Sequence, residues 1–190
     1  MRIFKYDIII KMLGRKYFVP KEAEFFGTPA YAIYPILKYI PAHVKTIWEP
    51  TTGQHHISSI LKNAGFTVIT TDLYPQSDDI TRMDFLNETP DFDYDMIILN
   101  PPFKKTLQFM DVLYKQDKPF MFIAPSHTIN SSKRHRMFKE KTINHIVFDL
   151  RVEYTERGSC PYYSSWFLGN VPSLQNQLIF ENLHKGIKYK

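Results

Sequence analysis

The chain has 190 residues, of which 44% are hydrophobic and 23% charged, a balance typical of a globular protein and unlike a disordered one. Its apolar runs are too short to cross a bilayer and its N-terminus lacks the pattern of a signal peptide, so we expect no membrane association and an intracellular, cytoplasmic location. The single cysteine, Cys160, excludes an internal disulfide framework and a cysteine-based zinc site, and the net charge of +5 suits a polyanionic partner. We expect one domain over residues 1–190.

In chain order, the first clear element is a helix over residues 28–40, because apolar residues recur there at helical spacing. Thr28 is a candidate N-cap, Pro29 suits the first helical position, and Pro35 delays or kinks the helix. Similar patterns predict strand 44–49, helix 55–65 closed by Gly65, strand 66–72, short strand 80–83, strand 93–100, helix 106–115, strand 119–125, helix 132–141, and strands 145–150 and 164–170. This alternation predicts an α/β fold with a mostly parallel, seven-stranded sheet flanked by helices.

Four consecutive predicted strands end in polar side chains. These are Glu49, Asp72, Asp84 and Asn100. Each alone is an ordinary turn residue, but parallel strands bring their carboxyl ends to one edge of a sheet, where open α/β sheets bind ligands. The four positions therefore predict one continuous binding edge.

The most specific motif is Asn-Pro-Pro-Phe at residues 100–103. It follows the apolar run Met96–Leu99, which has the character of a strand buried on both faces. Neither proline has an N–H to donate, so the chain must leave the sheet abruptly and hold the Asn100 amide at its edge.

A second motif, Glu-Pro-Thr-Thr-Gly at residues 49–53, lies between the first strand of this edge and its helix. Gly53 allows close approach of a ligand to the backbone, but the segment is neither a phosphate-binding loop nor the three-glycine dinucleotide fingerprint. Asp72 follows Gly53 by 19 residues, where an acid suits ribose hydroxyls.

Together these motifs resemble the S-adenosylmethionine-dependent adenine-N6 methyltransferases of nucleic acids, over roughly residues 26–170. The resemblance implies a Rossmann-like class I methyltransferase fold, S-adenosyl-L-methionine as cofactor and no metal. It implies a catalytic motif of Asn100, Pro101, Pro102 and Phe103. It also implies cofactor contacts from Thr28, Pro29, Glu49, Pro50, Thr51, Gly53, Asp72, Leu73, Asp84, Phe85 and Asn100.

The implied chemistry explains the catalytic residue types. The exocyclic amine of adenine is a weak nucleophile because its lone pair is delocalised into the ring. Asn100 Oδ1 and the Pro101 carbonyl can accept its two N–H groups, which directs the lone pair toward a methyl donor. The two acceptors also lie beside the nitrogen, on which positive charge develops in the transition state. Phe103 would stack on the unstacked base.

Two departures from the family affect the interpretation. His55 stands where the family usually has a second small residue, and an imidazole there can crowd the cofactor. The chain also has only about 20 residues after the last predicted strand, so we expect no separate target-recognition domain. Specificity must then come from other segments, from a homodimer or from a partner subunit.

Basic residues in two segments are candidates for nucleic-acid contact. Lys133, Arg134 and Arg136 fall in the cluster at 131–141, and Arg151 and Arg157 fall among tyrosines after strand 145–150. A solvated helix face and a loop with inward-packed tyrosines are the alternatives.

The sequence therefore favours methyl transfer to adenine N6 in nucleic acid, in DNA more than in RNA. Alternatives are RNA methylation at guanine N2 or adenine, methylation of protein glutamine, and a non-catalytic methyltransferase fold that binds nucleic acid. A nucleotide-binding oxidoreductase is disfavoured by the missing glycine fingerprint.

Overall fold

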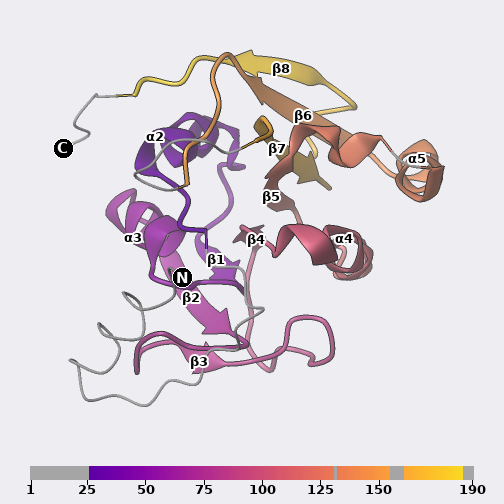
Figure 1. Cartoon of the computed structure of the whole chain (residues 1–190). Helices are drawn as coiled ribbons and strands as arrows, with labels where there is room; N and C mark the ends of the chain where they lie inside the picture. The colour runs from indigo at the N-terminus through magenta and orange to yellow at the C-terminus, as the bar shows by residue number, and fades with distance from the viewer. Residues whose placement is uncertain (1–25, 131, 155–160, 186–190) are drawn as a thin grey trace, which may run out of the picture.

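The computed structural model describes residues 26–130, 132–154 and 161–185, and one sheet forms its centre (Figure 1). The strands, in chain order, are β1 (Thr46–Glu49), β2 (Thr67–Asp72), β3 (Thr81–Arg82), β4 (Met96–Leu99), β5 (Phe120–Pro125), β6 (Ile143–Phe148), β7 (Ser164–Gly169) and β8 (Leu178–Glu181). Their order across the sheet is β3-β2-β1-β4-β5-β7-β6-β8. Only β7 runs antiparallel to its neighbours among these described strands. The α/β, mostly parallel fold is confirmed.

The order of the strands reverses between β1 and β4. From β1 the chain moves outward to β2 and β3, and it then returns to place β4 on the other side of β1. Such a reversal opens a crevice at the carboxyl ends of the two strands, because their connections leave in opposite directions. Glu49 ends β1 and Asn100 follows β4 directly, so both motifs of the sequence lie at this crevice.

Helices cover both faces of the sheet (Figure 1). On one face lie α2 (Ala30–Ile33), the 3-10 helix η1 (Tyr34–Tyr39) and α3 (His56–Asn63), whose apolar residues join Ile47, Ile98 and Trp166 in one core cluster. The other face carries α4 (Thr106–Lys115), which packs on Trp48, Phe120 and other residues of a second cluster. The remaining helices are η2 (Phe103–Lys105), η3 (Ser126–Ile129) and α5 (Ser132–Glu140). The sheet is therefore buried on both sides, which explains its continuous apolar strands.

The prediction for the first helix was wrong in detail. Thr28 does not cap a helix, and Pro29 precedes the first helical residue, Ala30. The α-helix ends after one turn, and a 3-10 helix with Pro35 near its start continues it. Proline lacks the N–H for the next α-helical bond, which accounts for the change. The short α2 is held by Trp166 instead, whose Nε1 donates to the carbonyl of Ala32 at 2.7 Å.

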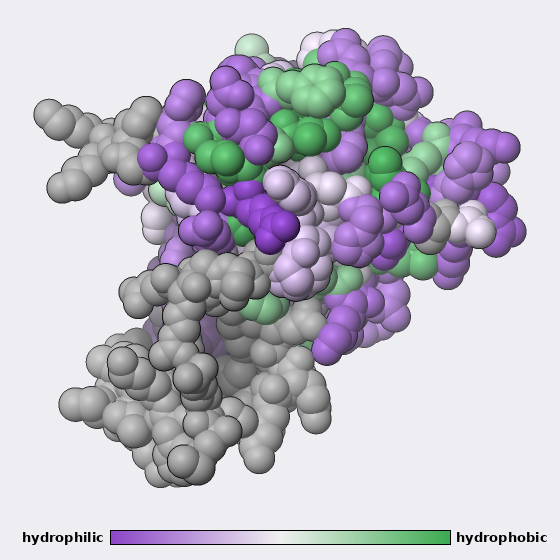
Figure 2. Space-filling model, turned by 45° about the horizontal axis from the view of Figure 1, so that its top comes forward, coloured by the Kyte–Doolittle hydropathy of each residue, from purple (hydrophilic) through white to green (hydrophobic). Residues whose placement is uncertain are grey.

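The sheet has eight strands in the described residues, against the seven that the sequence predicts. The additional strand, β8, pairs with β6 at the edge of the sheet. It has only four residues, too few for a periodic pattern to identify, and its Leu178 and Phe180 are largely exposed. Figure 2, which turns that side of the molecule forward, shows hydrophobic residues among hydrophilic ones there. Within the described ranges, no helix has the length and apolar character needed to span a membrane.

Candidate active site

The loop after β1 is fixed to the end of β2 by backbone and side-chain hydrogen bonds. Thr52 is buried, and its hydroxyl donates to the carbonyls of Glu49 at 2.9 Å and Thr71 at 3.1 Å. Gly53 has a φ of +56°, a conformation that glycine adopts without steric strain. The turn brings the Gly53 N–H within 2.9 Å of Asp72 Oδ2. The sequence-predicted pair of Gly53 and Asp72 is thus joined directly.

Asp72 is a buried carboxylate with two backbone donors. Besides the Gly53 N–H, it accepts the N–H of Tyr74 at Oδ1, at 2.8 Å. Burial raises the pKa of Asp72, and these two hydrogen bonds oppose that effect because they stabilise the charged form. Leu73 lies beside it, partly buried.

Glu49 is the most deeply buried acid of this edge, with only 1% of its surface exposed. Burial raises its pKa well above the ordinary value, hydrogen bonds from Ser58 lower it in part, and the nearby charge of Asp72 raises it further. In the described part of the chain, Glu49 Oε2 and the hydroxyl of Thr51 have no hydrogen-bond partner. Buried polar atoms are nearly always paired, so these two atoms retain hydrogen-bonding capacity that a polar or cationic ligand at the crevice could use. Pro50 is buried between them.

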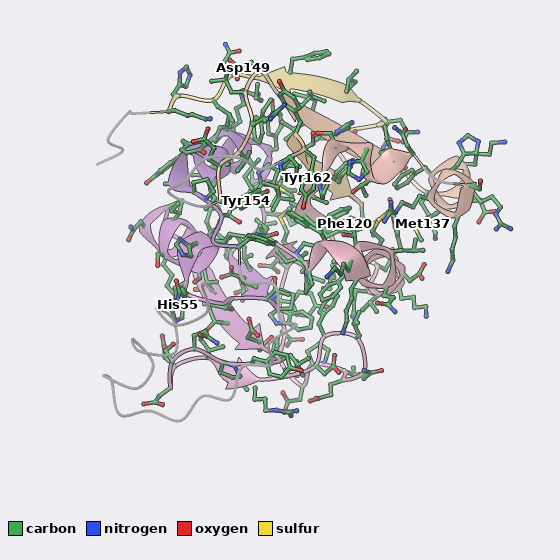
Figure 3. The ribbon with its side chains drawn as sticks, viewed as in Figure 1. His55, Phe120, Met137, Asp149, Tyr154 and Tyr162 are labelled. Carbon is green, nitrogen blue, oxygen red and sulfur yellow. The ribbon has the colours of Figure 1, made fainter. Side chains whose placement is uncertain are left out.

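The imidazole of His55 contacts side chains of α3 and of the loop after β2. Its Nδ1 lies 3.1 Å from Ser58 Oγ, and its Nε2 lies 2.9 Å from Ser77 Oγ and 3.2 Å from Asp79 Oδ1. The ring therefore bridges the start of α3 to the loop after β2, and it lies away from Tyr154 and Tyr162 (Figure 3). Its backbone has a φ of +63°, the left-handed region. Glycine suits such a position, and a residue with a Cβ is disfavoured there by about 1–2 kcal/mol.

Asn100 projects from the carboxyl end of β4 into contact with the segment before α2. Its Nδ2 donates to the Phe26 carbonyl at 2.7 Å and to the Thr28 hydroxyl oxygen at 3.0 Å. Pro101 is buried and Pro102 partly buried, and η2 begins at Phe103. The two motifs that lie 72 residues apart in the sequence therefore meet at one point. Pro29, between Thr28 and α2, is partly buried.

Aromatic rings from separate segments surround Phe103. Phe26 stacks on it with ring centres 5.9 Å apart and an interplanar angle of 14°. Tyr154 and Tyr162 meet it edge-on at 5.8 Å and 6.0 Å, and both are labelled in the central part of Figure 3. His127 in turn lies edge-on to Tyr162 at 5.9 Å. The cluster offers flat apolar surfaces beside the Asn100 amide.

A cavity of about 230 Å³ adjoins this aromatic cluster. It is lined by Phe103, Lys104, Pro125, His127, Thr128, Arg134 and Tyr162. Neither Lys104 nor His127 was predicted as a site residue. Lys104 directly follows the Asn-Pro-Pro-Phe motif and His127 lies two residues after the carboxyl end of β5, and these positions are the signal that could have identified them.

The remaining predicted cofactor contacts lie on the β3 side of the edge. Asp84 comes two residues after β3 rather than at its end, and its carboxylate accepts the Leu86 N–H at 3.0 Å and the Asn87 amide at 2.8 Å. Phe85 is buried against Trp48 and Phe109, with ring centres 5.2 Å and 5.1 Å away. Both residues thus have structural contacts of their own.

The predicted basic residues lie in two places. Lys133 and Arg136 are exposed on α5, Arg134 on the same helix lines the cavity beside Phe103, and Arg136 lines a second cavity of about 600 Å³. Arg151 follows β6, and its guanidinium lies over the ring of Tyr163 at 5.1 Å. Arg157 lies outside the described residues.

Comparison with known proteins gives a fold but no sequence family. No family model matches the chain, and no curated protein matches it in sequence. Its structure is similar to the type I restriction-modification methyltransferase subunit of Streptococcus thermophilus, with a TM-score of 0.60 and 10% identity over 93% of this chain and 50% of that one. It is also similar to a predicted O-methyltransferase of Agrobacterium tumefaciens, with a TM-score of 0.52 and 9% identity over 81% and 85% of the two chains. A third similar structure is a glycopeptide N-methyltransferase in complex with S-adenosylmethionine, with a TM-score of 0.50 and 7% identity over 82% and 100%. These likenesses show the Rossmann-like fold that such methyltransferases share.

Proposed function

We propose that this chain is an S-adenosylmethionine-dependent methyltransferase that modifies the exocyclic N6 amine of adenine in nucleic acid, with DNA as the preferred polymer. The observation that carries the proposal is the position of Asn100-Pro101-Pro102-Phe103 at the β1/β4 reversal, beside the open acceptor atom of Glu49. Polar groups from β1, β2 and β4 meet there, as a ligand-binding crevice of this fold requires.

The donor set of the crevice fits this cofactor. Glu49 Oε2, buried and without a partner in the described residues, suits a positively charged amino group. Asp72 retains acceptor capacity beyond its two backbone donors, which suits ribose hydroxyls. We include Pro50, Thr51 and Gly53 among the cofactor contacts because they lie in the loop after β1, and Thr28 because it contacts Asn100. When bound, S-adenosylmethionine supplies an electrophilic methyl group.

The catalytic role belongs to the Asn-Pro-Pro-Phe motif. Asn100 Oδ1 and the Pro101 carbonyl would accept the two N–H groups of the amine, which favours a pyramidal nitrogen with its lone pair free. The new N–C bond would form as the S–C bond to the methyl group breaks. S-adenosylhomocysteine would be the leaving group, and the extra proton on the nitrogen would then pass to solvent. The prolines hold the backbone in one conformation, so the acceptors need no rearrangement during the reaction. Phe26 already stacks on the Phe103 ring and the two tyrosines meet it edge-on, so a base removed from its helix would stack against this aromatic cluster, in which the Phe26 ring is exposed.

Specificity is best explained by a second component. The chain spans half of the Streptococcus restriction-modification subunit to which its fold is similar, and that protein is one subunit of a larger system. We therefore include a partner subunit, or a second copy of this chain, as the source of target recognition. The similarity to a restriction-modification subunit also favours DNA over RNA.

A transfer assay with radiolabelled S-adenosylmethionine tests the proposal. Duplex DNA, single-stranded DNA, RNA and protein extract serve as acceptors, and digestion identifies the labelled nucleoside or amino acid. Asn100→Ala should abolish transfer, whereas the same substitution at the exposed Asn63 on α3 should not. Label in N6-methyladenine of DNA is the expected result. Label in another nucleoside or in glutamine would correct the acceptor, and binding of nucleic acid without any transfer would favour the non-catalytic alternative.

A further inference from the structure

The side-chain amide of Asn100 can point either of two ways, and only one of them suits the proposed reaction. The terminal torsion of asparagine is broad and roughly two-fold, so rotation by 180° exchanges the amide oxygen and nitrogen with little change in shape. In the proposed reaction, the amine that receives the methyl group donates its N–H groups as hydrogen bonds. The amide oxygen of Asn100 must therefore face this amine. Something must therefore fix the amide.

The segment before α2 fixes it. The Phe26 carbonyl oxygen lies 2.7 Å from the Asn100 amide, and since a carbonyl only accepts, the atom that faces it must be the nitrogen. The Thr28 hydroxyl oxygen lies 3.0 Å from the same nitrogen. These two contacts use both hydrogens of the amide, which leaves Oδ1 directed away from the segment. In the flipped amide, Oδ1 would face the Phe26 carbonyl, and two acceptors at that distance repel each other.

Thr28 can serve Asn100 because it does not serve the helix. A threonine just before a helix usually caps the first turn with its hydroxyl, but α2 has no side-chain cap in this structure. Thr28 has only 2% of its surface exposed, so water competes little for its hydroxyl. A buried hydrogen bond of this kind is difficult to replace when its acceptor is removed.

The segment is itself held on several sides. Trp166 Nε1 donates to the Ala32 carbonyl at 2.7 Å, and the Tyr31 hydroxyl accepts the Glu153 N–H at 2.9 Å. Gly27 lies so close to the His56 ring that an added Cβ would be 2.4 Å from its Nε2. The backbone that carries Phe26 and Thr28 is therefore held in place where these residues contact Asn100.

We propose that Thr28 is a positioning residue, which, with the Phe26 carbonyl, holds the Asn100 amide with its oxygen toward the acceptor amine. This role rests on the proposed function and differs from contact with the cofactor. It acts through Asn100, and it accounts for the meeting of two motifs that lie 72 residues apart.

The test compares Thr28→Val, which keeps the shape but removes the acceptor, with Thr28→Ser, which keeps the hydroxyl. The first readout needs no activity: the side-chain amide signals of Asn100 in ¹⁵N-labelled protein, identified as the pair lost in Asn100→Ala. In Thr28→Val, one of the two amide protons should shift and exchange faster with water, and in Thr28→Ser the pair should stay close to wild type. Unchanged Asn100 signals in Thr28→Val would overturn the proposal.

The second readout is methyl transfer at saturating cofactor and nucleic acid, so that any weaker binding by the variants does not enter. Loss of one buried hydrogen bond should lower kcat about ten-fold in Thr28→Val, and Thr28→Ser should recover most of that loss. Equal kcat values in the two variants would overturn the positioning role. If wild-type protein transfers no methyl group while the amide signals respond as expected, the proposed function fails and the orientation of Asn100 stands.

Discussion

The backbone N–H of Gly53 donates to Asp72 Oδ2 at 2.9 Å, and this bond joins the loop after β1 to the end of β2. The other carboxylate oxygen accepts the Tyr74 N–H. Each oxygen of an ionised carboxylate can accept about two hydrogen bonds, so each retains a position for a ligand hydroxyl. Asp72 thus has both a structural role and the capacity for a binding role.

Substitution of Asp72 should separate these two roles. In Asp72→Ala, loss of hydrogen bonds to a charged group should weaken S-adenosylmethionine binding by about 1–3 kcal/mol, roughly 5- to 150-fold in Kd. Isothermal titration calorimetry measures the affinity, and a thermal scan without ligand reports the loss of the Gly53 and Tyr74 bonds. Asp84→Ala, at a partly exposed turn, provides a comparison on the β3 side. Wild-type affinity in Asp72→Ala would remove this residue from the site.

Glu49 should make the stability of the ligand-free protein depend on pH. Because burial raises its pKa in the folded state, the unfolded chain loses the proton first as pH rises above the ordinary value of 4.5. The free energy of unfolding should therefore fall as pH increases above 4.5, until the folded carboxyl group also ionises.

Glu49→Gln should reduce that slope and raise the thermal midpoint at pH 7, since glutamine cannot ionise. Asp72, whose pKa burial also raises, adds a slope of the same sign, so the pH dependence should shrink but not vanish. Denaturant unfolding between pH 4 and 8 measures the effect, with Glu140→Gln on exposed α5 as the control. Identical slopes in wild type and Glu49→Gln would contradict the assignment.

Salt dependence can decide whether α5 contacts nucleic acid. Each phosphate contact contributes about 0.9 to the slope of log K against log salt for duplex DNA, so replacing Lys133, Arg134 and Arg136 with glutamine should reduce the slope by up to about 3. Fluorescence anisotropy with labelled DNA over a range of salt concentrations measures it. The exposed lysines Lys45, Lys62 and Lys115, replaced together, form a control of equal charge. An equal reduction in both variants would mean that α5 acts only through net charge.

Gly169 is a position where any side chain should disturb the core. A Cβ there would lie 2.1 Å from Phe120 Cζ, and that ring is fully buried and bordered by Tyr114 and Phe122. Gly169→Ala should lower the free energy of unfolding by about 1–3 kcal/mol, because the ring has no free space to enter. Thermal unfolding followed by circular dichroism measures this loss. The double variant Gly169→Ala/Phe120→Leu should recover part of it, and an unchanged midpoint in Gly169→Ala would contradict the contact.

Local patterns in the sequence were sufficient for the mostly parallel α/β fold and for the edge of the sheet at which three of the predicted polar residues lie. The buried runs that end at Glu49, Asp72 and Leu99 are strands, and their parallel arrangement brings Glu49, Asp72 and Asn100 to one edge. These features depend on hydrophobic periodicity and on the absence of N–H groups in proline, which are properties of neighbouring residues.

Partners of individual side chains were not predictable in the same way. The Thr28 hydroxyl was assigned to its own helix, but it accepts from Asn100, and Phe26 stacks on Phe103. Both contacts depend on how α2 packs on the sheet, which no local pattern encodes. β8 was missed because Leu-Ile-Phe-Glu is too short a run to be identified by periodicity, and its pairing with β6 depends on how distant segments pack.

The hydrogen bond between Trp166 and Ala32 joins residues 134 positions apart, and it has a consequence for the order in which the protein matures. During synthesis, α2 emerges long before β7, so the segment that orients Asn100 lacks this anchor until most of the chain has left the ribosome. Contacts of such long range form late, because a large loop must close before they contribute. A nascent chain with β1 to β5 complete would therefore have the strands of the crevice but would lack the contact that anchors the segment beside Asn100.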